Sequence, residues 1–223
     1  MKRPVDWSLY LVTDRRLAGG RPLEAVVAAA VRGGVSAVQL REKECGTREF
    51  VELARKLKSL LGPVPLIIND RVDVALAVGA DGVHIGQSDM KYDDVRRLVG
   101  PDAIVGLSVD SAEQPAPADL DYLGVGPIFP TGTKTDAGPA LGLEGLARLR
   151  AASRHILVGI GGINATNAAA VLGAGADAIA VVSAICAAPD PERAAAGLRA
   201  ILSAAKRQPR RGCNPASCRS SRR

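Results

Sequence analysis

The chain has 223 residues, of which 47% are hydrophobic and 23% are charged, with a formal net charge of +6. The length fits one large domain or two small ones, the apolar fraction argues against a disordered chain, and no apolar run approaches the roughly 18 residues of a membrane span. Six arginines and no acidic residue lie in residues 207–223, and removing these six leaves 23 basic residues against 23 acidic ones. Residues 1–206, whose basic and acidic residues balance, are called the neutral body below. They give no evidence of a nucleic-acid-binding surface.

Short β-branched segments alternate with Ala- and Leu-rich segments along the chain. Strands are predicted at residues 9–13, 37–40, 66–69, 82–85, 104–108, 122–126, 156–159 and 178–182. Helices are predicted between them at residues 22–32, 47–61, 71–78, 91–99, 143–151, 165–172 and 191–206. Most of the strands are near-continuous apolar runs, which is typical of parallel strands covered on both faces. The fifth connection, residues 111–120, contains Pro115 and Pro117 and is too proline-rich for a long helix.

This order of elements predicts an α/β fold, a (β/α)8 TIM barrel with a short or irregular fifth connection. Eight βα units in about 200 residues match the lower size limit of that barrel. An open, doubly wound sheet is the alternative. Residues 1–206 would form the single barrel domain, and residues 207–223, which lose all periodicity, would form a basic, disordered C-terminal tail.

A short motif recurs before two of the predicted strands. Residues 79–85 read GADGVHI, residues 175–181 read GADAIAV, and residues 33–38, GGVSAV, are a looser third copy. Each copy connects a helix to the next strand. We interpret the copies as structural turns at the end of the barrel opposite the active site.

Two carboxylates follow neighbouring strands at the ends where the active sites of such barrels lie. Asp70 follows the strand at residues 66–69, and Asp89 follows the strand at residues 82–85. Neighbouring strands are about 4.8 Å apart, so both carboxylates can face one point on the rim. Taken singly, each is better explained as a cap of the next helix. As a pair among cations, they indicate a site for a hard cation such as Mg²⁺.

Three cations are predicted to project towards the same mouth of the barrel. They are Arg41, Lys43 and Lys134. Together with a metal ion they suit a highly charged anion, most simply a pyrophosphate. The alternative, a solvated charge run at residues 41–43, is less favoured because the run directly follows a buried strand.

A glycine-rich loop follows the seventh predicted strand. It contains Gly159, Gly161 and Gly162, and the eighth strand ends at Val182 and Ser183. In this barrel, loops 7 and 8 commonly bind phosphate with backbone N–H groups, and glycine lets the backbone approach the anion closely. The rim is therefore predicted to hold a second, metal-free site for a monophosphate.

Two anion sites on one rim indicate a transferase that joins two phosphorylated small molecules. Thr131 and Thr133, which flank Gly132, can add hydroxyls to the second site. The sequence offers no clear pair of nucleophile and base, because His84 and His155 are both interpreted as structural. Ionisation of a leaving group, stabilised by the metal and the cations, is therefore the expected chemistry.

At these residues the chain resembles the thiamine phosphate synthase family. The resemblance runs from about residue 9 to residue 203. It rests on LYLVTD at 9–14, QLREK at 39–43, IND at 68–70, GVHIGQ at 82–87, GPIFPTGTK at 126–134, GIGGI at 159–163 and VSAI at 182–185. The most specific of these are PTGTK and QLREK. The Arg- and Cys-bearing tail has no counterpart in the family pattern.

The resemblance implies a reaction and a role for each matching residue. A 4-amino-2-methyl-5-hydroxymethylpyrimidine pyrophosphate would ionise, and a thiazole phosphate would capture the cation to give thiamine phosphate and pyrophosphate. The resemblance implies that Mg²⁺ is held by Asp70 and Asp89. It implies that the pyrimidine pyrophosphate is held by Gln39, Leu40, Arg41, Glu42, Lys43, Asn69, Ser108 and Lys134, and the thiazole phosphate by Thr131, Gly132, Thr133, Gly162, Val182 and Ser183. The residues expected to act in catalysis are Arg41, Lys43, Ser108 and Lys134.

Two other functions remain open at this point. One is a sister enzyme that isomerises the thiazole phosphate, which the retained Asp70, Asp89 and Lys134 argue against. The other is a non-catalytic sensor of thiamine precursors whose basic tail contacts nucleic acid. The sequence does not specify an oligomeric state, and a homo-oligomer is compatible with it.

The four cysteines match neither a zinc site nor a redox CxxC motif. They are Cys45, Cys186, Cys213 and Cys218. The basic N-terminus is not followed by an apolar segment, so no secretory signal is evident, and reduced thiols in the cytoplasm are expected. Cys45 lies close to Lys43 and would be sensitive to oxidation if it were exposed.

Overall fold

Strands and helices alternate along the chain, and each strand is short. The strands are β1 (Leu9–Val12), β2 (Ala37–Leu40), β3 (Leu66–Asn69), β4 (Gly82–Ile85), β5 (Ile104–Val109), β6 (Tyr122–Val125), β7 (Leu157–Gly159) and β8 (Ala178–Val181). The helices are α1 (Leu23–Arg32), α2 (Thr47–Leu61), α3 (Val72–Val78), α4 (Tyr92–Val99), α5 (Gly142–Ala152), α6 (Ala168–Gly173), α7 (Ser183–Cys186) and α8 (Pro191–Arg207).

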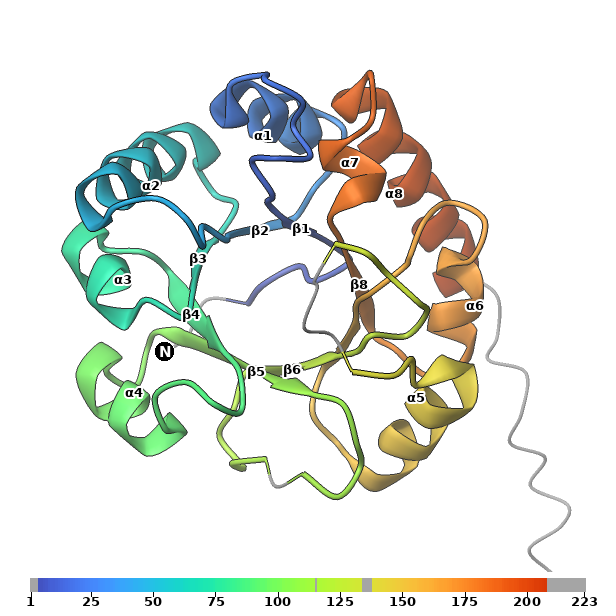
Figure 1. Ribbon diagram of the computed structural model, residues 1–223. Helices are drawn as coiled ribbons and strands as arrows, with labels where there is room; N and C mark the ends of the chain where they lie inside the picture. The colour runs from blue at the N-terminus through green and yellow to red at the C-terminus, as the bar shows by residue number, and fades with distance from the viewer. Residues whose placement is uncertain (1–3, 115, 134–137, 208–223) are drawn as a thin grey trace, which may run out of the picture.

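The eight strands are parallel and close into a barrel in chain order, with β8 paired to β1. The computed structural model describes residues 4–114, 116–133 and 138–207, and it places the helices in a ring around the barrel (Figure 1). The predicted (β/α)8 barrel is therefore confirmed, and the open sheet is excluded. Arg207 ends α8, and the rest of the predicted tail lies outside the described residues.

Two connections contain short or irregular elements, one after β5 and one after β8. Between β5 and β6 the described residues form turns and no helix, as the prolines predict (Figure 1). The short helix α7, which begins as soon as β8 ends, was not predicted, because four residues are too few to show a helical period. Over the part of the chain that is described, no helix has both the length and the apolar character needed to cross a membrane.

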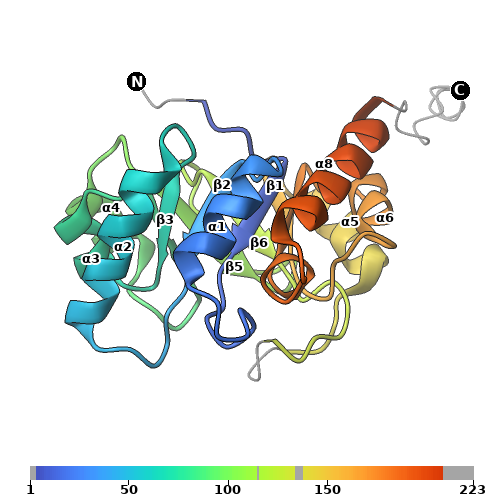
Figure 2. The same ribbon diagram turned by 90° about the horizontal axis from the view of Figure 1, so that it is seen from above.

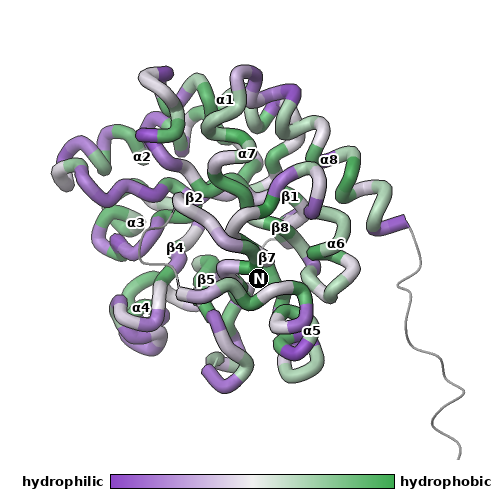
Figure 3. Tube along the Cα trace, turned by 45° about the vertical axis from the view of Figure 1, so that its right-hand side comes forward, coloured by the Kyte–Doolittle hydropathy of each residue, from purple (hydrophilic) through white to green (hydrophobic). Residues whose placement is uncertain are grey.

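Alternate residues of each strand belong to two separate apolar clusters. In β1, Leu9 and Leu11 pack outwards against the helices, whereas Tyr10 and Val12 point into the barrel. Hydropathy follows the same arrangement, because the strands are hydrophobic and the hydrophilic residues gather along the outer helices (Figure 3). Burial on both faces explains why the strands read as continuous apolar runs.

The recurring turns close the end of the barrel at which the strands begin. In the turn before each even-numbered strand, one side-chain oxygen accepts the N–H of a residue in the neighbouring odd-numbered strand. The four pairs are Ser36 Oγ with Leu9, Asp81 Oδ2 with Leu66, Asp121 Oδ2 with Val105 and Asp177 Oδ2 with Leu157, at distances of 3.0, 2.8, 2.9 and 2.9 Å. The interpretation of the motif as a structural turn is confirmed. The copy at Asp121 was missed because it lacks the preceding Gly-Ala.

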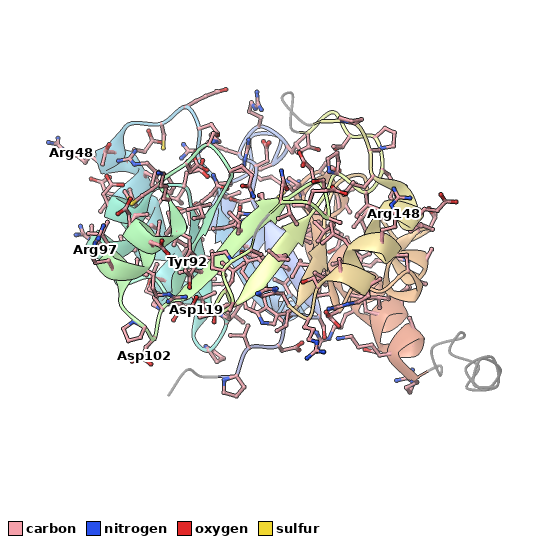
Figure 4. All side chains as sticks on the ribbon, turned by 90° about the horizontal axis from the view of Figure 1, so that it is seen from below. Arg48, Tyr92, Arg97, Asp102, Asp119 and Arg148 are labelled. Atoms are coloured by element: carbon pink, nitrogen blue, oxygen red, sulfur yellow. The ribbon has the colours of Figure 1, made fainter. Side chains whose placement is uncertain are left out.

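The three aspartates of these turns are also paired with bases on the surrounding helices. Their partners are Lys58 for Asp81 at 2.6 Å, Arg96 for Asp121 at 3.2 Å and Arg150 for Asp177 at 2.9 Å. Figure 4 shows Asp102 and Asp119 towards this end of the barrel and Arg48 towards the other.

The N-terminal segment covers this same end. Trp7 packs against the rings of Tyr10 and Tyr122, with centroid distances of 5.8 and 4.5 Å. Asp6 binds Arg199 of α8 at 2.6 Å. Figure 2 shows the N-terminal segment and the end of α8 at one end of the barrel and the loop between β1 and α1 at the other. Any cavity inside the barrel must therefore open at the carboxyl ends of the strands.

Candidate active site

A cavity of about 430 Å³ opens at the carboxyl ends of the strands. Residues from all eight strands and from the loops that follow them contribute to its wall. Among the residues predicted from the sequence, those that line it are Gln39, Arg41, Lys43, Asn69, Asp70, Asp89, Ser108, Thr131, Thr133, Gly162, Val182 and Ser183. The fold thus brings both predicted anion sites into one cavity.

Leu40 and Glu42 of the predicted set do not line this cavity. Leu40 is fully buried in the layer between the barrel and the helices. The Glu42 side chain is 6% exposed and pairs with Arg15 at 3.2 Å. Successive side chains of an extended segment point to opposite faces, so Gln39, Arg41 and Lys43 point inwards while Leu40 and Glu42 do not. Neither side chain therefore faces the cavity, and the assignment of these two residues to the substrate site stays a prediction.

The predicted set also includes Gly132 and Lys134. Gly132 lies between Thr131 and Thr133 but does not itself line the cavity. The N–H of Thr133 donates to the Thr131 hydroxyl at 3.2 Å, which folds this segment into a tight turn. Lys134, predicted as a cation of the pyrophosphate site, lies outside the described residues.

Lys43 and the two aspartates form the charged part of the wall. The Nζ of Lys43 lies 2.6 Å from Oδ2 of Asp70. Burial raises the pKa of Asp70 above its usual range, and the neighbouring Asp89 raises it further, while the ion pair with Lys43 opposes both. Asp70 and Asp89 are therefore close enough to repel one another, as the strand spacing predicts.

The backbone of Asp70 adopts a left-handed conformation. Its φ is +59°, which is unfavourable for a residue with a side chain. The N–H of Asp70 donates to the carbonyl of His84 at 2.8 Å, and its carbonyl accepts from Val72 at 3.1 Å. These bonds turn the chain sharply from β3 into α3 and leave the carboxylate at the cavity wall.

The helix-cap interpretation of the two aspartates is wrong. Neither α3 nor α4 has a side-chain hydrogen bond at its N-cap residue. Asp89 Oδ2 accepts the N–H of Gly86 at 2.7 Å, which orders the loop after β4. Both carboxylates therefore serve the cavity wall and not the helices.

These carboxylates fit a magnesium ion that is shared with a substrate. Within the described ranges, no three side chains of the metal-binding types gather in one place. Mg²⁺ takes one or two carboxylates and completes its shell with water and substrate phosphate oxygens, so a pair is sufficient. A divalent cation between Asp70 and Asp89 would relieve the repulsion that raises the pKa of Asp70.

The residues predicted to bind the monophosphate lie on adjoining loops. Gly161 and Gly162 have φ values of +97° and +64°, and a Cβ on Gly162 would lie 2.8 Å from atoms of Phe129 and Pro130. Glycine is therefore required where loop 7, which follows β7, packs on loop 6, which follows β6. Ser183 begins α7, so the free N–H groups at the start of this helix lie beside the cavity.

The floor of the cavity contains polar side chains that the sequence interpretation missed. His84, interpreted as structural, lines the cavity together with Tyr10 and Tyr122. Inward parity along β1, β4 and β6 is the signal that could have found them. His155 remains outside the site, with its ring bonded to Ser153 and to the carbonyl of Pro117.

Cys45 does not have the environment of a reactive thiol. It is half-buried, and burial followed by the charges of Glu42 and Glu49 raises the pKa of its thiol. A raised pKa lowers the thiolate fraction, and the thiolate is the form that is oxidised. The expected sensitivity to oxidation is therefore not favoured.

A closed barrel of eight parallel strands, with a charged cavity at their carboxyl ends, defines a (β/α)8-barrel protein with its ligand site in the usual place. The chain belongs to the thiamine monophosphate synthase family, whose model matches residues 9–185. The resemblance found in the sequence is confirmed.

Relatives of known name are similar over nearly their whole length. Thiamine-phosphate synthase of Albidiferax ferrireducens is 57% identical over 201 residues, which are 88% of this chain and 92% of the relative. That of Azorhizobium caulinodans is 55% identical over 212 residues, 93% of this chain and all of the relative. The solved structure of thiamine phosphate pyrophosphorylase from Pyrococcus furiosus has a TM-score of 0.81 and 41% identity, covering 89% of this chain and 96% of that one.

Proposed function

We propose that the protein is a thiamine-phosphate synthase that couples a hydroxymethylpyrimidine pyrophosphate to a thiazole phosphate. Family membership and the names of the relatives support the synthase activity. The observation that carries the substrate proposal is the convergence of Arg41, Lys43, Asp70 and Asp89 on one cavity. Two cations and a carboxylate pair in one wall suit a metal-bound pyrophosphate.

The proposed reaction exchanges one bond at the methylene carbon of the pyrimidine. The bond between this carbon and the pyrophosphate oxygen breaks, and its electron pair leaves with the pyrophosphate. The lone pair of the thiazole ring nitrogen then forms the new C–N bond. This nitrogen carries no proton, so the step needs no general base, and none was evident from the sequence.

In this proposal the residues that follow β2, β3 and β4 hold the leaving group. Arg41 and Lys43 bind pyrophosphate oxygens and stabilise the charge that develops as the bond breaks. Asp70 and Asp89 would hold Mg²⁺, which supplies further charge neutralisation at the phosphates. Lys134 is proposed as a third cation from the family resemblance alone, because it lies outside the described residues.

The thiazole phosphate is proposed to bind on the opposite side of the cavity. Gly162, Val182 and Ser183 line that wall, and Thr131 and Thr133 lie beside it on loop 6. Backbone N–H groups at these loops can donate to a phosphate that carries no metal. With each substrate anchored by its own anion site, the reacting atoms are held together inside the barrel.

We also propose the partners, the location and the domain organisation of the protein. The substrates are two phosphorylated small molecules, and the neutral body offers no basis for proposing nucleic acid as a partner. Cytoplasmic residence fits the free thiols of Cys45 and Cys186. A single barrel domain followed by a basic tail remains the proposed organisation, and a homo-oligomer remains compatible with it.

The decisive test is pyrophosphate release by the purified protein. We expect release only when both precursors and Mg²⁺ are present, with one thiamine phosphate formed per pyrophosphate. Asp70→Asn should abolish most of this release, whereas Asp102→Asn, at the opposite end of the barrel (Figure 4), should not. Tight binding of either precursor without release would contradict the proposal and favour the sensor. Isomerisation of the thiazole phosphate would favour the sister enzyme.

A further inference from the structure

A line of hydrogen-bonded side chains crosses the floor of the cavity. Gln39 Nε2 donates to Tyr10 Oη at 3.1 Å, and Tyr10 Oη lies 2.9 Å from Tyr122 Oη. Tyr122 Oη lies 2.8 Å from Nδ1 of His84, and Nε2 of His84 lies 2.9 Å from Ser108 Oγ. The line therefore begins on β2 and ends at Ser108, on the cavity wall.

The barrel is built to accommodate this line. A Cβ on Gly106 would lie 2.1 Å from the Tyr122 ring, and a Cβ on Gly124 would lie 2.9 Å from the His84 ring. The two rings stack with a centroid distance of 5.4 Å. Two glycines on neighbouring strands thus leave the space in which Tyr122 and His84 lie against the barrel wall.

Gln39 Nε2 can only donate, and with Gln39 donating to Tyr10 one direction along the line gives every hydroxyl proton an acceptor. Burial raises the pKa of both Tyr10 and Tyr122, so each keeps its single hydroxyl proton. In this direction Tyr10 accepts a hydrogen bond from Gln39 and donates one to Tyr122, which in turn donates one to His84 Nδ1. A neutral imidazole that accepts at Nδ1 carries its proton on Nε2 and donates to Ser108 Oγ.

We infer that Tyr122 and His84 are positioning residues that commit the Ser108 hydroxyl to donate its proton into the cavity. This inference rests on the proposed function and on the prediction from the sequence that Ser108, which lines the cavity, contacts the pyrimidine pyrophosphate. A hydroxyl that accepts from His84 keeps its own proton for an anionic oxygen, and hydrogen bonds to charged oxygens are the stronger kind. In the reverse direction Ser108 would donate to His84 and would present only lone pairs to the anion.

The imidazole tautomer of His84 tests the direction in the free protein. The chain has two histidines, so in ¹⁵N-histidine-labelled protein a His155→Gln background leaves the signals of His84 alone. We expect the Nε2–H tautomer, measured by NMR at a pH where the ring is neutral. Adding Tyr122→Phe should produce a mixture of tautomers, and Tyr10→Phe, which breaks the line one residue earlier, is the second variant. Tyr92→Phe, which removes a hydroxyl outside the site, is the matched control.

Pyrophosphate release tests the consequence for Ser108. We expect Tyr122→Phe to lower kcat about 10-fold or more, as loss of a hydrogen bond to a charged group does, with KM for the thiazole phosphate unchanged. Ser108→Ala should lose at least as much, and combining the two changes should add no further loss.

Three results would each overturn the inference. They are the Nδ1–H tautomer in the His155→Gln protein, a histidine spectrum that Tyr122→Phe does not change, and additive losses in kcat when Tyr122→Phe and Ser108→Ala are combined. The tautomer measurement needs no turnover. If wild-type protein releases no pyrophosphate, the proposed function fails while the direction of the line is still tested.

Discussion

The Nζ of Lys43 lies 2.6 Å from Oδ2 of Asp70, so a cation after β2 and a carboxylate after β3 neutralise one another in the free cavity. The same carboxylate is next to Asp89, which repels it. Lys43 therefore opposes the rise in the pKa of Asp70, at a position where a second cation, bound with the substrate, would complete the site. The charge of Asp70 matters for turnover and its backbone conformation matters for stability.

Asp70→Asn separates these two contributions. Asparagine tolerates the left-handed conformation at φ +59° but carries no charge, so we expect kcat to fall about 100-fold or more with little change in folding. Asp70→Ala should lose the same activity and in addition about 1 kcal/mol of stability, because alanine has no polar side chain whose local hydrogen bond offsets the cost of the left-handed conformation. Pyrophosphate release and urea unfolding measure the two effects. A wild-type rate in either variant would rule out the metal assignment.

The raised pKa of Asp70 predicts a specific dependence of stability on pH. Because its folded-state pKa lies above the unfolded value, ionising Asp70 destabilises the fold. The stability that this group contributes is fully present below the usual range of about 4 and is lost as the pH rises through the folded-state pKa.

The measurement for this pH dependence is urea unfolding of wild type and Asp70→Asn from about pH 4 to pH 7. The free energy of unfolding of the wild type, relative to Asp70→Asn, should fall with rising pH and then level off. A difference that grows in the opposite direction would mean that Lys43 outweighs burial and Asp89.

Asp121 and Asp119 are a matched pair for testing the side-chain hydrogen bond in the turn before β6, at the closed end of the barrel. Asp121 accepts the N–H of Val105 and pairs with Arg96, whereas Asp119 is 69% exposed and lies 3.9 Å from the same arginine. Asp121→Ala should cost about 1–3 kcal/mol, because it removes the acceptor of a buried N–H. Asp119→Ala should change the free energy of unfolding by less than about 0.5 kcal/mol. Equal losses in urea unfolding would show that the turn bond does not contribute.

Gly162→Ala should act on binding of the thiazole phosphate. Its Cβ would press on Phe129 and Pro130 and displace loop 7, so KM for the thiazole phosphate should rise at least several-fold. Gly62→Ala is the control, because Gly62 has a φ of +55° with open space around it and lies at the end of α2. Both variants should lose at least about 1 kcal/mol of stability from the unfavourable φ, and Gly162→Ala should lose more because its Cβ meets the backbone of Pro130, but only Gly162→Ala should change KM. An unchanged KM in Gly162→Ala would remove loop 7 from the phosphate site.

The barrel could be predicted because each of its strands is an apolar run buried on both faces. Periodicity could not show α7, which spans four residues, or tell where β5 ends, since it continues to Val109. Strand order followed from the repeated βα units, whereas closure of the barrel is visible only in the pairing of β1 with β8.

The candidate site was predictable where the chain places polar residues after a buried strand. Arg41, Lys43, Asp70 and Asp89 all reach the cavity for that reason. Leu40 was included with its motif although strand parity turns it outwards. The polar floor was missed because a tyrosine inside a strand is as typical of an apolar core as of a hydrogen-bonded cavity.

In the proposed reaction, one cavity binds a metal-assisted pyrophosphate and a metal-free phosphate and joins the organic parts of the two substrates. The most direct measurement is pyrophosphate release with both precursors while Mg²⁺ is titrated from zero. This reaction predicts saturable dependence on Mg²⁺ and no release when either precursor is omitted. Release at the same rate without the metal, or from the pyrimidine pyrophosphate alone, would contradict it.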